Sequence, residues 1–112
     1  QQLVGDPKLV NRSLIDDVLK FKRIDGVTEA LRSIADAFIS GGKQTDNMRT
    51  ELSNLSMPVQ VIWGSVDKII PVAHAADLPA EADVHVIDGY GHLVQLEAAS
   101  EVNKLLESCI SA

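Results

Sequence analysis

Apolar residues recur every three or four positions through the first forty residues, and this spacing predicts two amphipathic helices. The first carries Val10, Leu14, Val18 and Phe21 on one face. Asp6-Pro7 is a typical start signal, because an acid at the N-cap accepts backbone hydrogen bonds and proline suits the first helical position. We therefore expect the first helix to begin at residue 7.

The second predicted helix follows after a short connection. Asp25 is expected to cap it, and Gly41-Gly42 is expected to end it, because glycine favours helix C-termini. Its apolar face consists of Val27, Ala30, Leu31, Ile34, Ala35 and Phe38. We interpret residues 1–44 as a hairpin of two helices with polar outer faces.

Beyond residue 44 the pattern changes to an alternation of short strands and helices. Residues 45–55 predict a short polar helix, and residues 72–78 and 98–110 predict two more. Residues 59–63 are rich in β-branched side chains and nearly apolar on both faces, which is typical of a buried parallel strand. A second strand is predicted over residues 82–88.

This order, strand-helix-strand-helix, predicts an α/β fold over residues 45–112, since parallel strands need helical crossovers. Two strands do not make a stable sheet by themselves. We therefore expect the strands to pair with a part of the protein outside these residues, or with a second copy of the chain. Light scattering that showed a stable, well-folded monomer would contradict a homo-oligomer.

Composition narrows the possible partners. The net charge of −6 argues against nucleic acid or an anionic membrane surface, because phosphate binding needs basic residues. No apolar run approaches the roughly 20 residues of a membrane span. The lone Cys109 excludes an intrachain disulfide and favours the cytoplasm. Gln1 in place of an initiator methionine favours a processed or truncated product.

Two residues carry the candidate chemistry. Asp67 follows the first predicted strand, and His92 follows the second. The carboxyl ends of parallel strands meet at one edge of a sheet, where α/β proteins place functional groups. A carboxylate and an imidazole in contact are the acid and base of a hydrolytic triad. Glycines beside both residues (Gly64, Gly89 and Gly91) supply the sharp turns.

The alternative interpretation is a surface aspartate in a turn and a histidine that caps the next helix. Asp88 is a rival acid, but it is too close to His92 in sequence to reach it easily. Ser65 lacks the G-x-S-x-G setting that exposes a nucleophile, so the nucleophile is missing. No metal site is predicted, because His74, His85 and His92 lack ligand spacing.

These residues resemble the C-terminal half of an α/β-hydrolase. The matching motifs are Gly64-Ser65-Val66-Asp67 with Ile70-Pro71 after it, and Gly91-His92 with Glu97 five positions on. In that family the acid follows the seventh strand and the histidine the eighth. The resemblance implies a C-terminal fragment of the fold, with residues 1–44 as the helical cap and residues 45–112 as the last two strands and their helices. The proline common in the family after the glutamate is Ala99 here.

A narrower resemblance rests on three segments: KRIDGV at 22–27, PVQVIWG at 58–64 and GHLVQLEAA at 91–99. They are similar to the acyltransferase component of acetoin dehydrogenase complexes. The resemblance implies a parent protein that passes an acetyl group from a lipoyl thioester to coenzyme A, with a nucleophilic serine upstream.

The resemblance also implies that this chain alone is inactive and that its partners are the upstream part of the same protein and other subunits of the complex. Two alternatives stay open: a non-catalytic scaffold domain of a multienzyme complex, and a generic α/β-hydrolase that cleaves an ester or thioester. Lys22 and Arg23 could meet a phosphate of coenzyme A, but a solvated helix end is the simpler interpretation.

Overall fold

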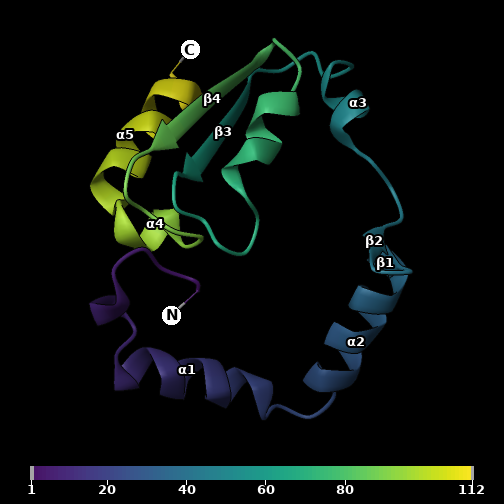
Figure 1. Cartoon of the computed structure of the whole chain (residues 1–112), viewed down its shortest axis with the longest axis vertical. Helices are drawn as coiled ribbons and strands as arrows, with labels where there is room; N and C mark the ends of the chain where they lie inside the picture. The colour runs from purple at the N-terminus through teal and green to yellow at the C-terminus, as the bar shows by residue number, and fades with distance from the viewer. Residues whose placement is uncertain (1, 112) are drawn as a thin grey trace. The chain divides into compact units, whose positions relative to one another are not determined.

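The computed structural model describes residues 2–111, which divide into two compact units (Figure 1). One unit comprises residues 2–9 and 49–111 and contains a parallel sheet. The other, Val10–Met48, contains two helices and a small hairpin. The structure is therefore a mixed α/β arrangement, with one small parallel and one small antiparallel sheet.

The parallel sheet consists of β3 (Val59–Gly64) and β4 (Ala82–Ile87), paired residue for residue so that Gly64 lies opposite Ile87. The parallel pairing predicted from the sequence is confirmed. The segment that connects the strands contains a 3-10 helix, Val72–Asp77, where an ordinary helix was predicted. The helix predicted over residues 45–55 is a single turn, α3 (Arg49–Leu52).

After β4 the chain forms the one-turn helix α4 (Val94–Glu97) and the longer α5 (Ala99–Ile110), which lies alongside β4 (Figure 1). The predicted final helix is confirmed. The core joins this helical end to the sheet: Ile87, Val94, Ala98 and Val102. Ile62, Tyr90 and Leu105 pack against it.

The strands are less buried than their sequence predicted. Val59 to Trp63 are only partly buried, and Val86 is 50% exposed. The expectation of a fully buried strand was wrong for the described residues, because two strands leave much of the sheet without a covering element. Apolar strands of this kind still present surface that further strands or helices could cover.

The first long helix begins at Arg12 and not at residue 7, where the sequence predicted its start. Asp6 does not start the first long helix; its side chain accepts a hydrogen bond from the Lys8 amide at the 3-10 turn Pro7–Leu9. Helix α1 (Arg12–Lys22) is capped by Asn11, whose side chain accepts from the Leu14 amide at 2.9 Å. Asparagine is as good an N-cap as aspartate. Asp6 accepts its backbone hydrogen bond in the separate 3-10 turn, so it starts that turn and not the long helix.

Helix α2 (Val27–Phe38) departs from the prediction at both ends. Its N-cap is Gly26, without a side-chain cap, rather than Asp25. Its chain continues into a hairpin of β1 (Ile39–Ser40) and β2 (Lys43–Gln44). Gly41 and Gly42 form the hairpin turn with φ of 58° and 76°, a left-handed pair suited to a type I′ turn. They do not end the helix.

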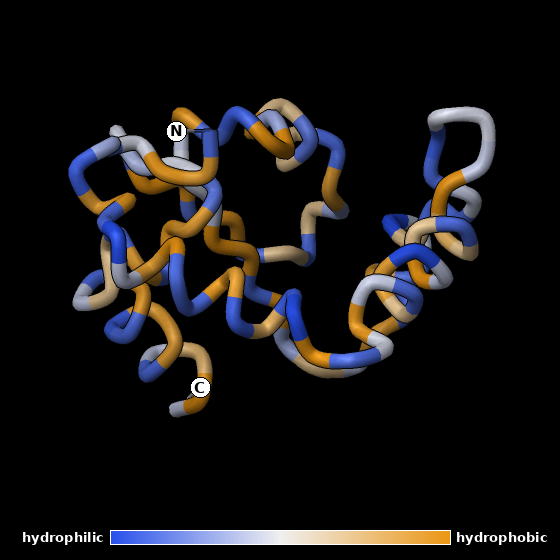
Figure 2. Tube along the Cα trace, turned by 90° about the horizontal axis from the view of Figure 1, so that it is seen from below, coloured by the Kyte–Doolittle hydropathy of each residue, from blue (hydrophilic) through white to orange (hydrophobic). Residues whose placement is uncertain are grey.

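The two long helices present large apolar side chains to solvent. The colours of the trace change between hydrophobic and hydrophilic within the helical turns (Figure 2). No residue of α1 or α2 is buried. The exposed apolar side chains in this unit are Ile15, Val18, Leu19, Phe21, Ile24, Leu31, Ile34, Phe38, Ile39 and Met48. A helix with so apolar a face ordinarily packs it against another element.

None of the helices within residues 2–111 has the length and apolar character needed to cross a membrane.

The core predicts which truncations on α5 destabilise the fold. Val102 is 6% exposed and Leu106, one turn on, is 45% exposed. Val102→Ala should lower the free energy of unfolding by about 1.5–3 kcal/mol, through lost burial and a residual cavity. Leu106→Ala, the matched control, should cost less than about 1 kcal/mol. Urea unfolding followed by circular dichroism measures both, and equal losses would contradict this core.

Candidate functional site

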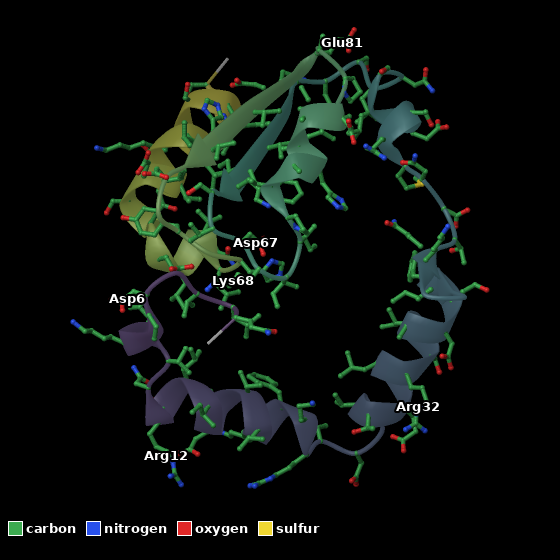
Figure 3. All side chains as sticks on the ribbon, viewed as in Figure 1. Asp6, Arg12, Arg32, Asp67, Lys68 and Glu81 are labelled. Carbon is green, nitrogen blue, oxygen red and sulfur yellow. The ribbon has the colours of Figure 1, made fainter. Side chains whose placement is uncertain are left out.

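Asp67 is positioned by the loop that follows β3 (Figure 3). One oxygen of its carboxylate, Oδ1, accepts hydrogen bonds from the amides of Ile69 at 2.8 Å and Ile70 at 3.0 Å. The side chain is 5% exposed. The local turn therefore fixes one oxygen of the acid, and the other oxygen, Oδ2, is available to a partner.

The loop after β4 is tied to the loop after β3. Ser65 Oγ donates to Asp88 Oδ1 at 2.9 Å and accepts from the Gly89 amide at 2.8 Å. The amide of Val66 donates to the Tyr90 carbonyl at 3.0 Å. These bonds hold the two strand ends against each other, so the serine beside the candidate acid serves as a link between loops.

Gly64 allows this close approach. A Cβ atom at that position would overlap the carbonyl oxygens of Tyr90 and Gly91. Because both contacts are backbone atoms, no side-chain adjustment could relieve the overlap. The glycine that ends β3 therefore permits the loop before His92 to lie directly against the strand.

The structure brings Asp67 and His92 together. Asp67 Oδ2 and His92 Nδ1 are 2.9 Å apart, although the residues are 25 positions apart in sequence. The carboxylate accepts, so Nδ1 carries the proton in this arrangement and Nε2 is the nitrogen able to take one. His92 is 30% exposed, which leaves the imidazole accessible. A buried acid that orients a partly exposed imidazole is the geometry of a base prepared for proton transfer.

The electrostatics of Asp67 favour the charged form. Burial by itself raises the pKa of the Asp67 carboxyl, but hydrogen bonds from His92, Ile70 and Ile69 and attraction to His92 outweigh it. The pKa therefore lies below its ordinary value of 3.8. The acid is a carboxylate at neutral pH and can stabilise a positive charge on the imidazole.

A small open depression of about 210 Å³ lies beside this pair. Trp63 forms part of its wall and donates from Nε1 to the Ile70 carbonyl at 3.1 Å, so the indole does more than pack at the strand end. The lining residues are Ile62, Trp63, Gly64, Asp67, Ile70, His92 and Val94. The depression is thus mostly apolar, with the imidazole as its basic group.

Three further residues noted in the sequence, His74, His85 and Cys109, are not among those that line the depression. His74 is exposed, and His85 is half-buried and bonds to Asp83 at 2.8 Å. Cys109 is partly buried on α5. Residues 2–111 hold no group of three or more His, Cys, Asp or Glu side chains arranged for a metal ion.

Sequence reasoning missed a second set of contacts around His92. The carboxylate of Glu97 accepts from the amide of Gly91, just before the histidine, and from the amide of Gly5. The motif Gly91-His92 with Glu97 five positions on was a sequence signal for the first contact, between Gly91 and Glu97. Nothing local marked the second, because Gly5 and Glu97 are 92 positions apart.

The chain is similar to known proteins over most of its length. The chain is 43% identical to the dihydrolipoyllysine-residue acetyltransferase component of the acetoin cleaving system of Cupriavidus necator, over 94% of its own length. It is 48% identical to the same component from Pseudomonas putida, over 92% of its length. The chain is a homologue of this acetyltransferase component. The narrower resemblance seen in the sequence is confirmed.

The homology covers only part of these relatives. The chain spans 28% of the Cupriavidus necator protein and 27% of the Pseudomonas putida protein. A more distant relative, the 2-hydroxy-6-oxononadienedioate/2-hydroxy-6-oxononatrienedioate hydrolase of Paraburkholderia xenovorans, is 26% identical over 84% of the chain, which spans 34% of that protein. No family model matches the chain.

The lowered pKa of Asp67 predicts a pH-dependent contribution to stability. A carboxyl whose folded pKa lies below 3.8 stabilises the fold above that pH, and the contribution disappears as pH falls through the folded pKa. Asp67→Asn should therefore destabilise the chain at about pH 7 and less at about pH 3. Urea unfolding at both pH values measures the difference.

Glu81 provides the matched control, since it is an exposed carboxylate in the turn before β4 (Figure 3). Glu81→Gln should change the free energy of unfolding little at either pH. An Asp67→Asn effect of the same size at both pH values would show that the charged carboxylate does not contribute as described.

Proposed function

We propose that this chain supplies the acid and the base of a Ser-His-Asp triad in the hydrolase-like domain of an acetoin-cleaving acetyltransferase component. The observation that carries the proposal is the 2.9 Å contact between Asp67 and His92, made at the ends of adjacent parallel strands. The chain's identity of 43–48% to acetyltransferase components supports the acyl-transfer assignment.

In this proposal His92 is the general base. Its Nε2 takes the proton from a serine hydroxyl as the hydroxyl oxygen forms a bond to the acyl carbonyl carbon. The protonated imidazole then gives the proton to the leaving sulfur or oxygen as the acyl bond to that atom breaks. Asp67 holds Nδ1 protonated and stabilises the charged imidazole throughout. The serine belongs to an upstream part of the same protein.

The second half-reaction repeats the cycle with the acyl-serine. His92 removes a proton from the incoming acceptor, whose sulfur or oxygen attacks the acyl carbon, and then returns a proton to the serine oxygen. The mainly apolar wall formed by Trp63, Ile70 and Val94 would contact the short acyl chain.

The residues of the depression fit the groups implied by the family only in part. Lipoate, if bound, would supply the acyl group as a thioester, and an apolar depression of about 210 Å³ beside His92 suits a two-carbon acyl chain. Coenzyme A carries phosphates, and no Lys or Arg lines the depression. Its residues therefore do not fit the nucleotide part of coenzyme A. The proton and acyl transfers proposed for His92 do not involve that part.

The proposal extends to the architecture. Helices α1 and α2 are the helical part of the proposed cap, residues 1–44, although residues 3–6 of that range belong to the sheet-containing unit; residues 45–112 are the C-terminal strands and helices of an α/β-hydrolase core. The remaining strands of that core would pair along the edges of the two-stranded sheet, and its helices would cover the partly exposed faces of β3 and β4. We place the parent protein in the cytoplasm, with other subunits of the acetoin-cleaving complex as partners.

A second candidate, simple hydrolysis, is favoured by the relatives that are named hydrolases and are 26–27% identical. The same acid and base would then activate water in the second half-reaction in place of a thiol acceptor. The two reactions differ in the acceptor alone, so one preparation assayed with and without a thiol acceptor separates them.

His92→Ala, made in the complete gene product that contains these residues, should lower kcat for acetyl transfer by about a thousandfold or more. Asp67→Asn should lower kcat by a comparable factor, because the imidazole loses its orienting acceptor. Steady-state assays with an acetyl-dihydrolipoyl donor and coenzyme A measure transfer, and a short acyl ester without acceptor measures hydrolysis.

His74→Ala, at an exposed histidine of the 3-10 helix, is the control and should leave kcat within about twofold. A His92→Ala protein with full activity would reject the triad. It would favour the alternative in which the domain is a scaffold for a lipoyl-bearing subunit.

We also propose that the isolated chain self-associates. It exposes large apolar side chains on α1 and α2 and leaves both strands partly uncovered. Size-exclusion chromatography with light scattering should show a dimer or larger species whose proportion rises with concentration. A concentration-independent monomer of about 12.1 kDa would contradict this expectation.

A further inference from the structure

Glu97 occupies an unusual place beside the candidate base. It is the last residue of α4, and its two carboxylate oxygens face backbone amides outside that helix. Oε1 accepts from the Gly91 amide at 2.8 Å, and Oε2 accepts from the Gly5 amide at 2.7 Å. A longer contact of 3.4 Å joins Oε2 to the Asp6 amide. Hydrogen bonds to a charged acceptor are about twice as strong as neutral ones.

The segment that Glu97 holds, residues 3–6, is here called the N-terminal strap. Its Leu3 carbonyl accepts from the amide of Leu93 at 3.0 Å. Val4 is 3% exposed, the lowest exposure among the buried apolar residues of the described chain. The strap is therefore anchored in the sheet-containing unit through Val4, while Leu3 is 47% exposed.

His92 lies between two anchored neighbours. The amide before it, of Gly91, is bound to Glu97, and the amide after it, of Leu93, is bound to the strap. A Cβ atom at Gly91 would lie 2.6 Å from the Gly5 nitrogen, which shows how closely the strap lies against the histidine loop. The backbone on both sides of the imidazole is thus fixed by Glu97 and the strap.

We propose that Glu97, acting with the N-terminal strap, is a positioning residue that holds the backbone of His92 so that its imidazole meets Asp67. The inference rests on the proposed function for its catalytic consequence. Glu97 makes no contact with the imidazole; it acts through Gly91 and Gly5. A purely local function, as a stabiliser of the start of α5, does not account for a bond to a residue 92 positions away.

Glu97→Gln tests this directly, because glutamine keeps the shape but places an NH₂ group against one of the two amide donors. In the complete gene product it should lower kcat for acetyl transfer by about tenfold to a hundredfold, through a misplaced base, with KM within about twofold. Glu101→Gln is the matched control, since Glu101 is an exposed glutamate on α5 one turn further along. It should leave both constants unchanged within about twofold.

Gly5→Ala attacks the same arrangement from the strap. A Cβ atom there would overlap the Gly89 carbonyl, so the strap must move away from Glu97, whose carboxylate stays intact. If strap and carboxylate act together, the double variant should lose little more activity than the more affected single variant. Independent losses that multiply would contradict a shared action.

Two spectroscopic readouts do not depend on activity. Hydrogen exchange at the Gly91 amide should quicken in Glu97→Gln. The NMR signal of the His92 Nδ1 proton, held by Asp67, should weaken or disappear. A merely structural glutamate would lower the unfolding midpoint without either change in the protein that remains folded, and circular dichroism monitors that fraction.

The outcomes separate the two proposals. Full kcat in Glu97→Gln, with an unchanged Nδ1 signal and an inactive His92→Ala, overturns the positioning inference and leaves the proposed function standing. Full kcat in His92→Ala overturns the proposed function. In that case kcat no longer reports on the imidazole, and the NMR signal of the His92 Nδ1 proton in Glu97→Gln is the measurement that tests whether Glu97 positions it. An unchanged signal there rejects the inference as well.

Discussion

The parallel, in-register pairing of β3 with β4 is the constraint on which the rest of the site depends. It places Gly64 opposite Ile87, so both strands end at the same level and their loops leave the sheet together. The absence of a side chain at Gly64 then allows the second loop to lie against the first. With a different register, Asp67 and His92 could both be present in the sequence and still not meet.

Local patterns in the sequence were sufficient for the elements that position the candidate pair. Short apolar runs marked β3 and β4, and a helical periodicity marked α5, because each of these signals arises within a few residues. The expectation that Asp67 and His92 lie together followed from a general property of α/β sheets, the grouping of loops at the carboxyl ends of parallel strands. The glycines around both loops supported the same expectation.

Other features depended on competition between signals or on distant contacts. Asp6-Pro7 and Asn11 are both acceptable helix starts, and the sequence alone did not show that Asp6 would begin a separate turn. Gly41 and Gly42 suit a helix end and a hairpin turn equally well. The burial of Val4 and the bond of Glu97 to Gly5 were invisible, because no short-range pattern records a contact across most of the chain.

The bond between Gly5 and Glu97 also has a consequence for how the molecule is made. Residues 3–6 leave the ribosome before residues 49–111 of the same unit, and Glu97, which accepts from the Gly5 amide, is synthesised 92 positions after Gly5. Contacts of such separation form late, since the intervening chain loses entropy on closure. The amides of Ile69 and Ile70 that hold Asp67 lie within three positions of it, whereas the histidine loop gains its final support only when translation has passed α4.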